Sequence, residues 1–134
     1  MDPLAIILDP GLGFAKTGEH NLQLLRDLRQ FVQLEFPILV GASRKRFLGQ
    51  LLADADGAPR PPAGRDAATA ALSVLAGQQG VWGVRVHEPR ATRDAFLAWE
   101  AVRPQAADGF AAAPFQPRRT PADQAAESTP GVSP

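Results

Sequence analysis

The feature that most limits the fold of this chain is a regular alternation between short apolar runs and segments with helical periodicity. The apolar runs are rich in Ile, Leu and Val and occupy residues 4–9, 37–40 and 81–86. Runs of this length, bounded by Gly or Pro, are typical of buried strands. Because their apolar residues are continuous rather than alternating, we expect both faces of the resulting sheet to be covered.

Helices are predicted between and after these strands. The first covers residues 19–33, and the others cover residues 44–52, 66–78 and 92–102, with a Pro/Gly-rich loop at 54–64. The order β-α-β-α-α-β-α favours an α/β fold with parallel strands and right-handed crossovers. Three strands are few for an independent α/β domain, whereas a (β/α)8 barrel has eight strands and about 250 residues. We therefore expect this chain to be part of a larger fold.

The end of the chain differs in composition from the rest. Residues 1–103 carry the apolar periodicity of folded structure, whereas residues 104–134 are rich in Pro and Ala. In that tail Phe110, Phe115 and Val132 are the only larger hydrophobic residues. Such a segment buries too little apolar surface to offset the entropy lost on ordering, so we predict that it is disordered. A Pro/Ala-rich linker is the alternative.

Charge and composition exclude several classes of function. The 14 Lys and Arg residues balance 14 Asp and Glu residues, which gives no argument for a nucleic-acid or membrane partner. The chain has no cysteine, so disulfides and thiolate metal sites are excluded. No His/Asp/Glu cluster has metal-ligand spacing, and no apolar run approaches the roughly 18 residues of a membrane span. Without a recognisable signal peptide, we expect a cytoplasmic protein.

Polar residues follow each predicted strand at its carboxyl end, where parallel α/β folds bind ligands. They are Asp9 after the first strand, Ser43-Arg44-Lys45 after the second, and Arg85 and His87 at the end of the third. Asp9 either receives hydrogen bonds from a ligand such as an aminopyrimidine or starts a turn before Pro10. Phe14, a few residues further on, forms either an apolar wall of the site or part of the core.

The two basic segments also leave alternatives open. Arg85 and His87 lie on one face of a strand, where they form either an anion clamp or an ion pair with Glu88. Ser43 either faces a ligand or caps the following helix. The neighbouring Arg44 and Arg46 fit a solvated basic face. From the residues alone, the sequence supports an anion-binding α/β site that contains one carboxylate.

The same residues resemble the motifs of dihydropteroate synthases. Their sequence is similar to that of the actinobacterial branch of this family. The resemblance rests on three separate segments in the same order, residues 8–17 with His20-Asn21, residues 39–49, and residues 84–87. It extends over about residues 4–102 and implies strands six to eight of a (β/α)8 TIM barrel. After His87 the sequence departs from the family, because Glu88-Pro89 replaces the usual Asp-Val. That change is expected to affect the start of the helix, since Pro is tolerated there.

The resemblance implies a transferase of folate biosynthesis that joins 6-hydroxymethyl-7,8-dihydropterin diphosphate to 4-aminobenzoate. It implies that Asp9, Lys45 and Arg85 bind the pterin and that Lys45 and Arg85 are also catalytic. Arg85 and His87 would hold the diphosphate, and Phe14 and Ser43 would bind the aminobenzoate. The family uses Mg²⁺, whose ligand we expect in an N-terminal part that is absent here, and it forms homodimers. The alternatives are an inactive remnant, a non-catalytic pterin-binding paralogue, or another pterin-binding barrel such as a corrinoid methyltransferase.

Overall fold

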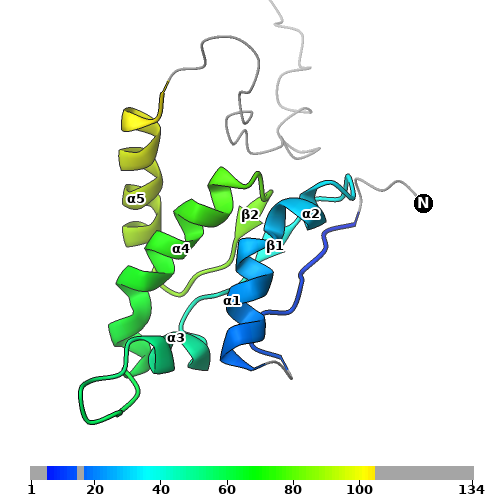
Figure 1. Cartoon of the computed structure of the whole chain (residues 1–134). Coiled ribbons are helices and arrows are strands. Elements are labelled where there is room, and N and C mark those ends of the chain that lie inside the picture. Colours follow the sequence, from blue (N-terminus) through cyan, green and yellow to red (C-terminus); the bar gives the residue numbers. More distant parts are fainter. Residues whose placement is uncertain (1–5, 15–16, 105–134) are drawn as a thin grey trace, which may run out of the picture.

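The computed structural model describes residues 6–14 and 17–104 of the chain, and within them three extended segments lie side by side in sequence order (Figure 1). Strand β1 (Leu39–Val40) pairs in parallel with β2 (Gly83–Val84). On its other edge, β1 continues into a parallel bridge between Leu8 and Ile38. The predicted parallel order is confirmed, although the regular strands are shorter than residues 37–40 and 81–86.

The helices follow the predicted order with changed boundaries. They are α1 (Gly18–Arg26), α2 (Leu28–Val32), α3 (Arg46–Leu51), the short 3₁₀ helix η2 (Pro62–Arg65), α4 (Asp66–Gln78) and α5 (Pro89–Val102). Helix α4 has the predicted bounds. The predicted loop at 54–64 extends only to the start of η2, and α5 begins three residues earlier than expected.

The prediction of a single helix over residues 19–33 is wrong, because the helix is interrupted at Asp27, which lies between α1 and α2. In a continuous helix the backbone N–H of Arg29 donates to the carbonyl of Leu25. Here the side-chain amide of Gln79 bridges these two groups, accepting from Arg29 N at 3.1 Å and donating to Leu25 O at 2.7 Å. A side chain inserted into the hydrogen-bond ladder is a recognised cause of helix breaks.

Helix α3 begins at Arg46 instead of at residue 44, because Arg44 has a left-handed backbone with φ of 56°. Lys45 occupies the position before the helix. The alternative that Ser43 caps this helix is therefore wrong. At the start of α5, Pro89 is the first helical residue, and the carboxylate of Glu88 accepts from Ala91 N at 2.6 Å. The unusual Glu88-Pro89 pair thus makes an ordinary helix start, as expected.

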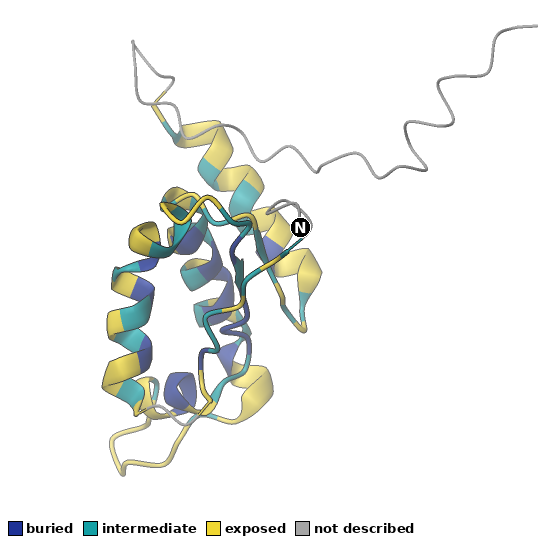
Figure 2. Cartoon of the chain, turned by 90° about the vertical axis from the view of Figure 1, so that its right-hand side faces the viewer, coloured by how far each residue is buried: buried dark blue, intermediate teal, exposed yellow. Residues whose placement is uncertain are grey.

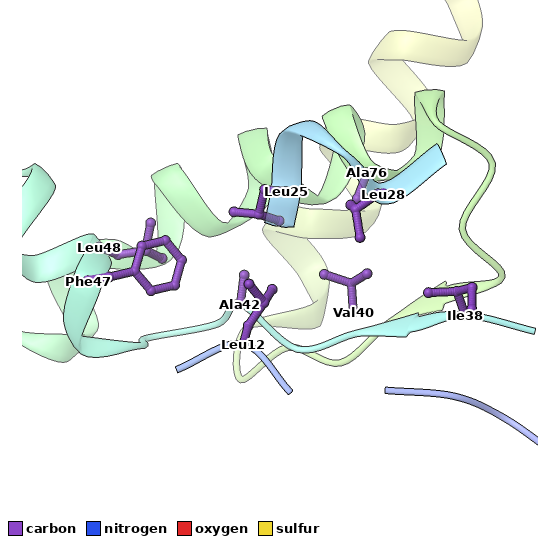
Figure 3. Packing of buried hydrophobic residues seen from close by; sticks show 9 residues of the cluster. All are labelled: Leu12, Leu25, Leu28, Ile38, Val40, Ala42, Phe47, Leu48 and Ala76. Carbon is purple, nitrogen blue, oxygen red and sulfur yellow. The ribbon is translucent and has the colours of Figure 1, made fainter. Parts of the chain in front are cut away.

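The core lies between the strands and the helices packed on one face of them (Figure 3). Ile38 and Val40 are buried beneath Leu28 and Ala76, whereas Leu39 between them is only partly buried. Buried residues line the inner sides of the helices, and exposed residues form their outer sides (Figure 2). Among the described residues, the expected helical cover on both faces of the sheet is not seen.

Two predictions concern the ends of the chain or its relation to a bilayer. Helix α5 ends at Val102, and the predicted boundary of the folded part near residue 103 stays a prediction. The tail prediction for residues 104–134 falls almost wholly outside the described residues. No helix in the described part is long and apolar enough to cross a membrane.

Candidate functional site

The residues predicted from the strand ends form three side-chain pairs at one edge of the sheet. The pairs are Asp9 with Arg85, Ser43 with His87, and Phe14 with Lys45. Neighbouring strands lie about 4.8 Å apart, so the three strand ends span on the order of 10 Å. Each pair joins residues that are distant in sequence, and the fold alone brings them together.

Asp9 uses its two carboxylate oxygens differently. Oδ1 accepts a hydrogen bond from Gly11 N at 2.8 Å, which forms the turn that the alternative interpretation anticipated. Oδ2 lies 3.5 Å from a guanidinium nitrogen of Arg85. The Arg85 side chain is 63% exposed, so this ion pair contributes little to stability and leaves the guanidinium accessible to an anion. The alternative ion pair of Arg85 with Glu88 is not formed; Glu88 caps α5 instead.

Arg85 also lies against Gly41 of the neighbouring strand end. A Cβ atom at Gly41 would lie 3.0 Å from Nη2 of Arg85. A side chain at position 41 would therefore displace the guanidinium. The glycine leaves room for Arg85 to lie across the end of β1.

Ser43 and His87 are joined by two contacts. The Oγ atom of Ser43 lies 2.9 Å from Nδ1 of His87 and accepts from the His87 backbone N–H at 3.0 Å. Ser43 is only 5% exposed, whereas His87 is exposed. The buried serine thus contacts both the backbone and the ring of the exposed histidine.

The ammonium group of Lys45 lies 4.3 Å from the centre of the Phe14 ring, in a cation–π contact. Phe14 is exposed, so the alternative that it belongs to the core is excluded. Gly13 makes the approach possible, because its φ is +78° and a Cβ there would lie 2.9 Å from Cδ of Lys45. Gly is the residue that accommodates both conditions.

A buried asparagine holds the loop that carries Phe14. Asn21 is 1% exposed; its Oδ1 accepts from Gly13 N at 2.7 Å, and its Nδ2 donates to Thr17 O at 2.8 Å. The sequence interpretation used Asn21 only as part of a motif and assigned it no role. Its signal was a polar residue in the first turns of an amphipathic helix, on the side that faces the core.

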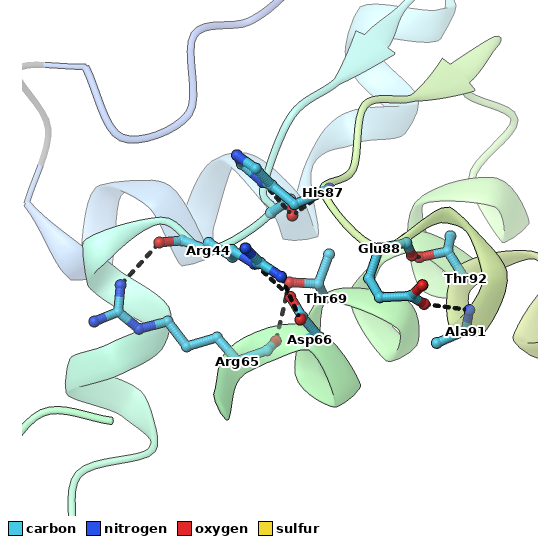
Figure 4. A network of polar contacts seen from close by, with 9 residues as sticks. Arg44, Arg65, Asp66, Thr69, His87, Glu88, Ala91 and Thr92 are labelled. Carbon is cyan, nitrogen blue, oxygen red and sulfur yellow. Dashed lines mark hydrogen bonds and ion pairs between the residues drawn. The ribbon is translucent and has the colours of Figure 1, made fainter. Parts of the chain in front are cut away.

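An arginine–carboxylate network lies beneath the loop that carries Ser43 and Lys45 (Figure 4). Arg44 donates two hydrogen bonds, of 2.9 and 2.8 Å, to the carboxylate of Asp66. These bonds raise the pKa of Arg44 and lower that of Asp66. Arg65 is only 9% exposed and donates to the carbonyl of Arg44 at 2.8 Å and of Arg60 at 2.7 Å. The idea that Arg44 belongs to a solvated basic face is therefore wrong, whereas Arg46 is exposed.

Four of the six predicted site residues are exposed to solvent. Two hollows of about 260 and 310 Å³ occur elsewhere, one beside Pro37 and Trp82 and the other between α1 and α4. Neither is lined by any of the six predicted site residues. Across residues 6–14 and 17–104, no group of three or more His, Asp or Glu side chains is arranged to hold a metal ion. The Mg²⁺ ligand that the resemblance implies stays a prediction.

Comparison with known proteins identifies the class to which this chain belongs. A family model described as pterin binding enzyme matches residues 1–87. The chain therefore belongs to the family of pterin binding enzymes.

Within that family the similar proteins are dihydropteroate synthases, as the three motifs predicted. The dihydropteroate synthase of Mycobacterium leprae is 58% identical over 108 residues, which cover 78% of this chain and 38% of the relative. That of Neisseria meningitidis serogroup C is 43% identical over 101 residues, 75% of this chain and 34% of the relative. The mycobacterial match is consistent with the predicted resemblance of the motifs to the actinobacterial branch. The chain spans little more than a third of the length of these relatives.

Solved structures give the same result. The dihydropteroate synthase from Xanthomonas albilineans in complex with 7,8-dihydropteroate matches with a TM-score of 0.64 and 42% identity, over 72% of this chain and 36% of that one. The same enzyme with 4-aminobenzoic acid matches with a TM-score of 0.65 and 42% identity, over 72% and 33% of the two chains. The α/β fold of the described residues is thus shared with dihydropteroate synthases.

Proposed function

We propose that this chain forms part of a dihydropteroate synthase active site, namely the part at the carboxyl ends of its three parallel extended segments. The reaction condenses 6-hydroxymethyl-7,8-dihydropterin diphosphate with 4-aminobenzoate and yields 7,8-dihydropteroate and diphosphate. The observation that carries the proposal is the arrangement of Asp9, Lys45 and Arg85 at the ends of adjacent parallel strands. The similar X. albilineans enzyme has been solved with 7,8-dihydropteroate and with 4-aminobenzoic acid.

Asp9 and Lys45 are proposed to bind the pterin. A carboxylate accepts two hydrogen bonds from an aminopyrimidine edge; in Asp9 the turn uses Oδ1, and Oδ2 makes only the weak contact with Arg85. The turn fixes the orientation of the carboxylate before the ligand arrives. The ammonium group of Lys45 is a compact donor on a flexible stem, placed at the next strand end beside the Phe14 ring.

Arg85 and His87 are proposed to hold the diphosphate as it leaves. When the bond between the pterin methylene carbon and the diphosphate oxygen breaks, the electron pair stays on that oxygen and negative charge develops there. Donors already in place lower the barrier because they need no reorganisation at that moment. The fork of the Arg85 guanidinium suits phosphate oxygens, and its weak ion pair with Asp9 is readily exchanged for an anion.

Phe14 is proposed as the wall of the aminobenzoate side of the site. The aromatic amine attacks the methylene carbon, forms the new C–N bond and loses one proton. Holding the amine close to that carbon reduces the entropic cost of the step. Ser43 was also expected to bind the aminobenzoate carboxylate, but its hydroxyl is buried and lies against His87. Its contribution is therefore proposed to pass through His87.

We further propose that the three extended segments are consecutive strands, six to eight, of a (β/α)8 barrel. Their parallel order and the helices on one face support this assignment, because the inner face of a barrel strand meets other strands. A cytoplasmic homodimer follows from the same resemblance. The family's Mg²⁺ would supply Lewis-acid stabilisation of the leaving diphosphate.

Isothermal titration calorimetry of the purified 134-residue chain with pyrophosphate tests the proposal. We expect saturable binding that Arg85→Ala weakens by at least about tenfold, as for the loss of charge-assisted hydrogen bonds. Arg93→Ala is the matched control, because it removes an exposed arginine on α5. Equal binding by both variants would show that Arg85 is not the anion ligand. A pyrophosphate-release assay with both substrates separates a catalytic chain from a non-catalytic pterin-binding one.

A further inference from the structure

We infer that Ser43 is a positioning residue that fixes which ring nitrogen of His87 donates to the anion site; this inference rests on the proposed function. The observations are the two contacts that one buried hydroxyl makes with one exposed histidine. Oγ of Ser43 lies 3.0 Å from the backbone nitrogen of His87 and 2.9 Å from Nδ1 of its ring. The pair thereby joins the loop after β1 to the end of β2.

The hydroxyl has one hydrogen and two lone pairs, and the described residues offer that hydrogen one acceptor, Nδ1 of His87. The backbone N–H of His87 is always a donor, so Oγ of Ser43 must accept in that contact. If Nδ1 donated to the second lone pair instead, the hydrogen of this buried hydroxyl would lack an acceptor among the described residues, so the hydroxyl donates to Nδ1. A neutral imidazole that accepts at Nδ1 carries its hydrogen on Nε2. Ser43 therefore keeps the hydrogen of the neutral ring on Nε2.

A fixed Nε2–H suits the diphosphate that Arg85 is proposed to hold. Phosphate oxygens are acceptors and need donors, and a ring with its hydrogen on Nδ1 would present a lone pair at Nε2 instead. If the ring becomes protonated, both nitrogens donate, so Nε2 remains a donor. The contact with Ser43 keeps His87 a donor in either charge state. While the ring is neutral, the hydroxyl hydrogen of Ser43 is used by Nδ1, so it cannot also be donated to the carboxylate of the aminobenzoate.

The test observes the ring directly. Long-range ¹H–¹⁵N correlation spectra of the uniformly labelled chain distinguish a protonated from an unprotonated ring nitrogen. The chain has two histidines, so a His20→Gln variant assigns the His87 signals. With the ring neutral, we expect His87 to show an unprotonated Nδ1 and a protonated Nε2. A wild-type ring with its hydrogen on Nδ1 overturns the inference without any variant.

Substitutions then separate positioning from general structure. Ser43→Ala should shift both ring signals towards exchange between tautomers and weaken pyrophosphate binding about fivefold, the effect of one hydrogen bond. Ser43→Thr keeps the hydroxyl and should restore both. Ser73→Ala is the control, because Ser73 is equally buried but donates to Thr69 within α4. Ring signals and binding that are unchanged in Ser43→Ala would overturn the inference.

The two measurements also separate this inference from the proposed function. The expected ring signals without pyrophosphate binding would contradict the proposed function and leave the positioning by Ser43 intact. Pyrophosphate binding that is weakened by Arg85→Ala but unchanged by Ser43→Ala would support the proposed function and contradict the positioning by Ser43.

Discussion

Arg44 and Asp66 are joined by two parallel hydrogen bonds, of 2.9 and 2.8 Å, between guanidinium and carboxylate. The pair links the loop after β1 to the first residue of α4. Arg44 is held there with a positive φ of 56°, a conformation that residues other than Gly rarely adopt. Bidentate pairing is directional, so it fixes the loop that carries Ser43 and Lys45 on either side of Arg44.

The Arg44–Asp66 pair should make stability depend on pH. The hydrogen bonds from Arg44 hold the pKa of Asp66 below its ordinary value of 3.8, although desolvation opposes them. The unfolded chain then binds this proton more readily than the folded chain. The stabilisation is present above ~pH 4 and is lost as the pH falls through the lowered folded pKa. Asp66→Asn should remove that part of the pH dependence in urea unfolding, whereas exposed Asp94→Asn should not; identical profiles for Asp66→Asn and wild type would contradict the assignment.

Gly41→Ala should disturb the anion site with little effect on the fold. The added Cβ would lie 3.0 Å from the end of the Arg85 side chain, which is flexible and moves aside. We expect pyrophosphate to bind about tenfold more weakly, because the guanidinium loses its position. Gly83→Ala is the matched control, since its Cβ would meet Leu39 at an ordinary 3.5 Å. Unchanged binding by the Gly41 variant would mean that the position of Arg85 beside β1 is not the one that binds anions.

Leu28→Ala should destabilise the folded chain strongly. Leu28 is 0% exposed and packs in the cluster between α2 and the strands. Truncation of a buried leucine typically lowers the free energy of unfolding by about 2–5 kcal/mol. Leu34→Ala is the control, because Leu34 is 55% exposed, and a change within about 0.5 kcal/mol is expected there. Urea unfolding followed by circular dichroism gives both values; a small loss for Leu28 would place it outside the core.

The order of elements and the strand ends could be predicted from the sequence because they depend on local patterns. Apolar runs and helical spacing are read within about ten residues, and parallel strands then bring Asp9, Lys45 and Arg85 to one edge. The bounds of α4 followed from its Ala-rich composition between a proline-rich loop and Gly80.

The errors arose where a contact between distant residues decides local structure. Ser43 has the sequence signature of a helix cap, yet its hydroxyl contacts His87, 44 residues away. Arg44 appeared suited to a solvated face, but Asp66 lies 22 residues further on and pairs with it. No pattern within either segment reports such partners, since each depends on how the strands and helices are placed in space.

Gln79 supplies the sharpest case, because its side chain breaks a helix 50 residues earlier in the chain. Its amide accepts from Arg29 N and donates to Leu25 O. Gln79→Glu keeps the shape but replaces the donor with a second oxygen, which then faces the Leu25 carbonyl without a hydrogen bond. We expect a loss of about 1–3 kcal/mol in the free energy of unfolding, the usual penalty for an unsatisfied group. Gln78→Glu, at the exposed neighbouring position, should change it by less than about 0.5 kcal/mol. Because the two variants add the same charge to the same turn of α4, only the lost contact distinguishes them. Equal stabilities by urea unfolding would therefore show that the amide bridge does not hold α1 and α2 apart.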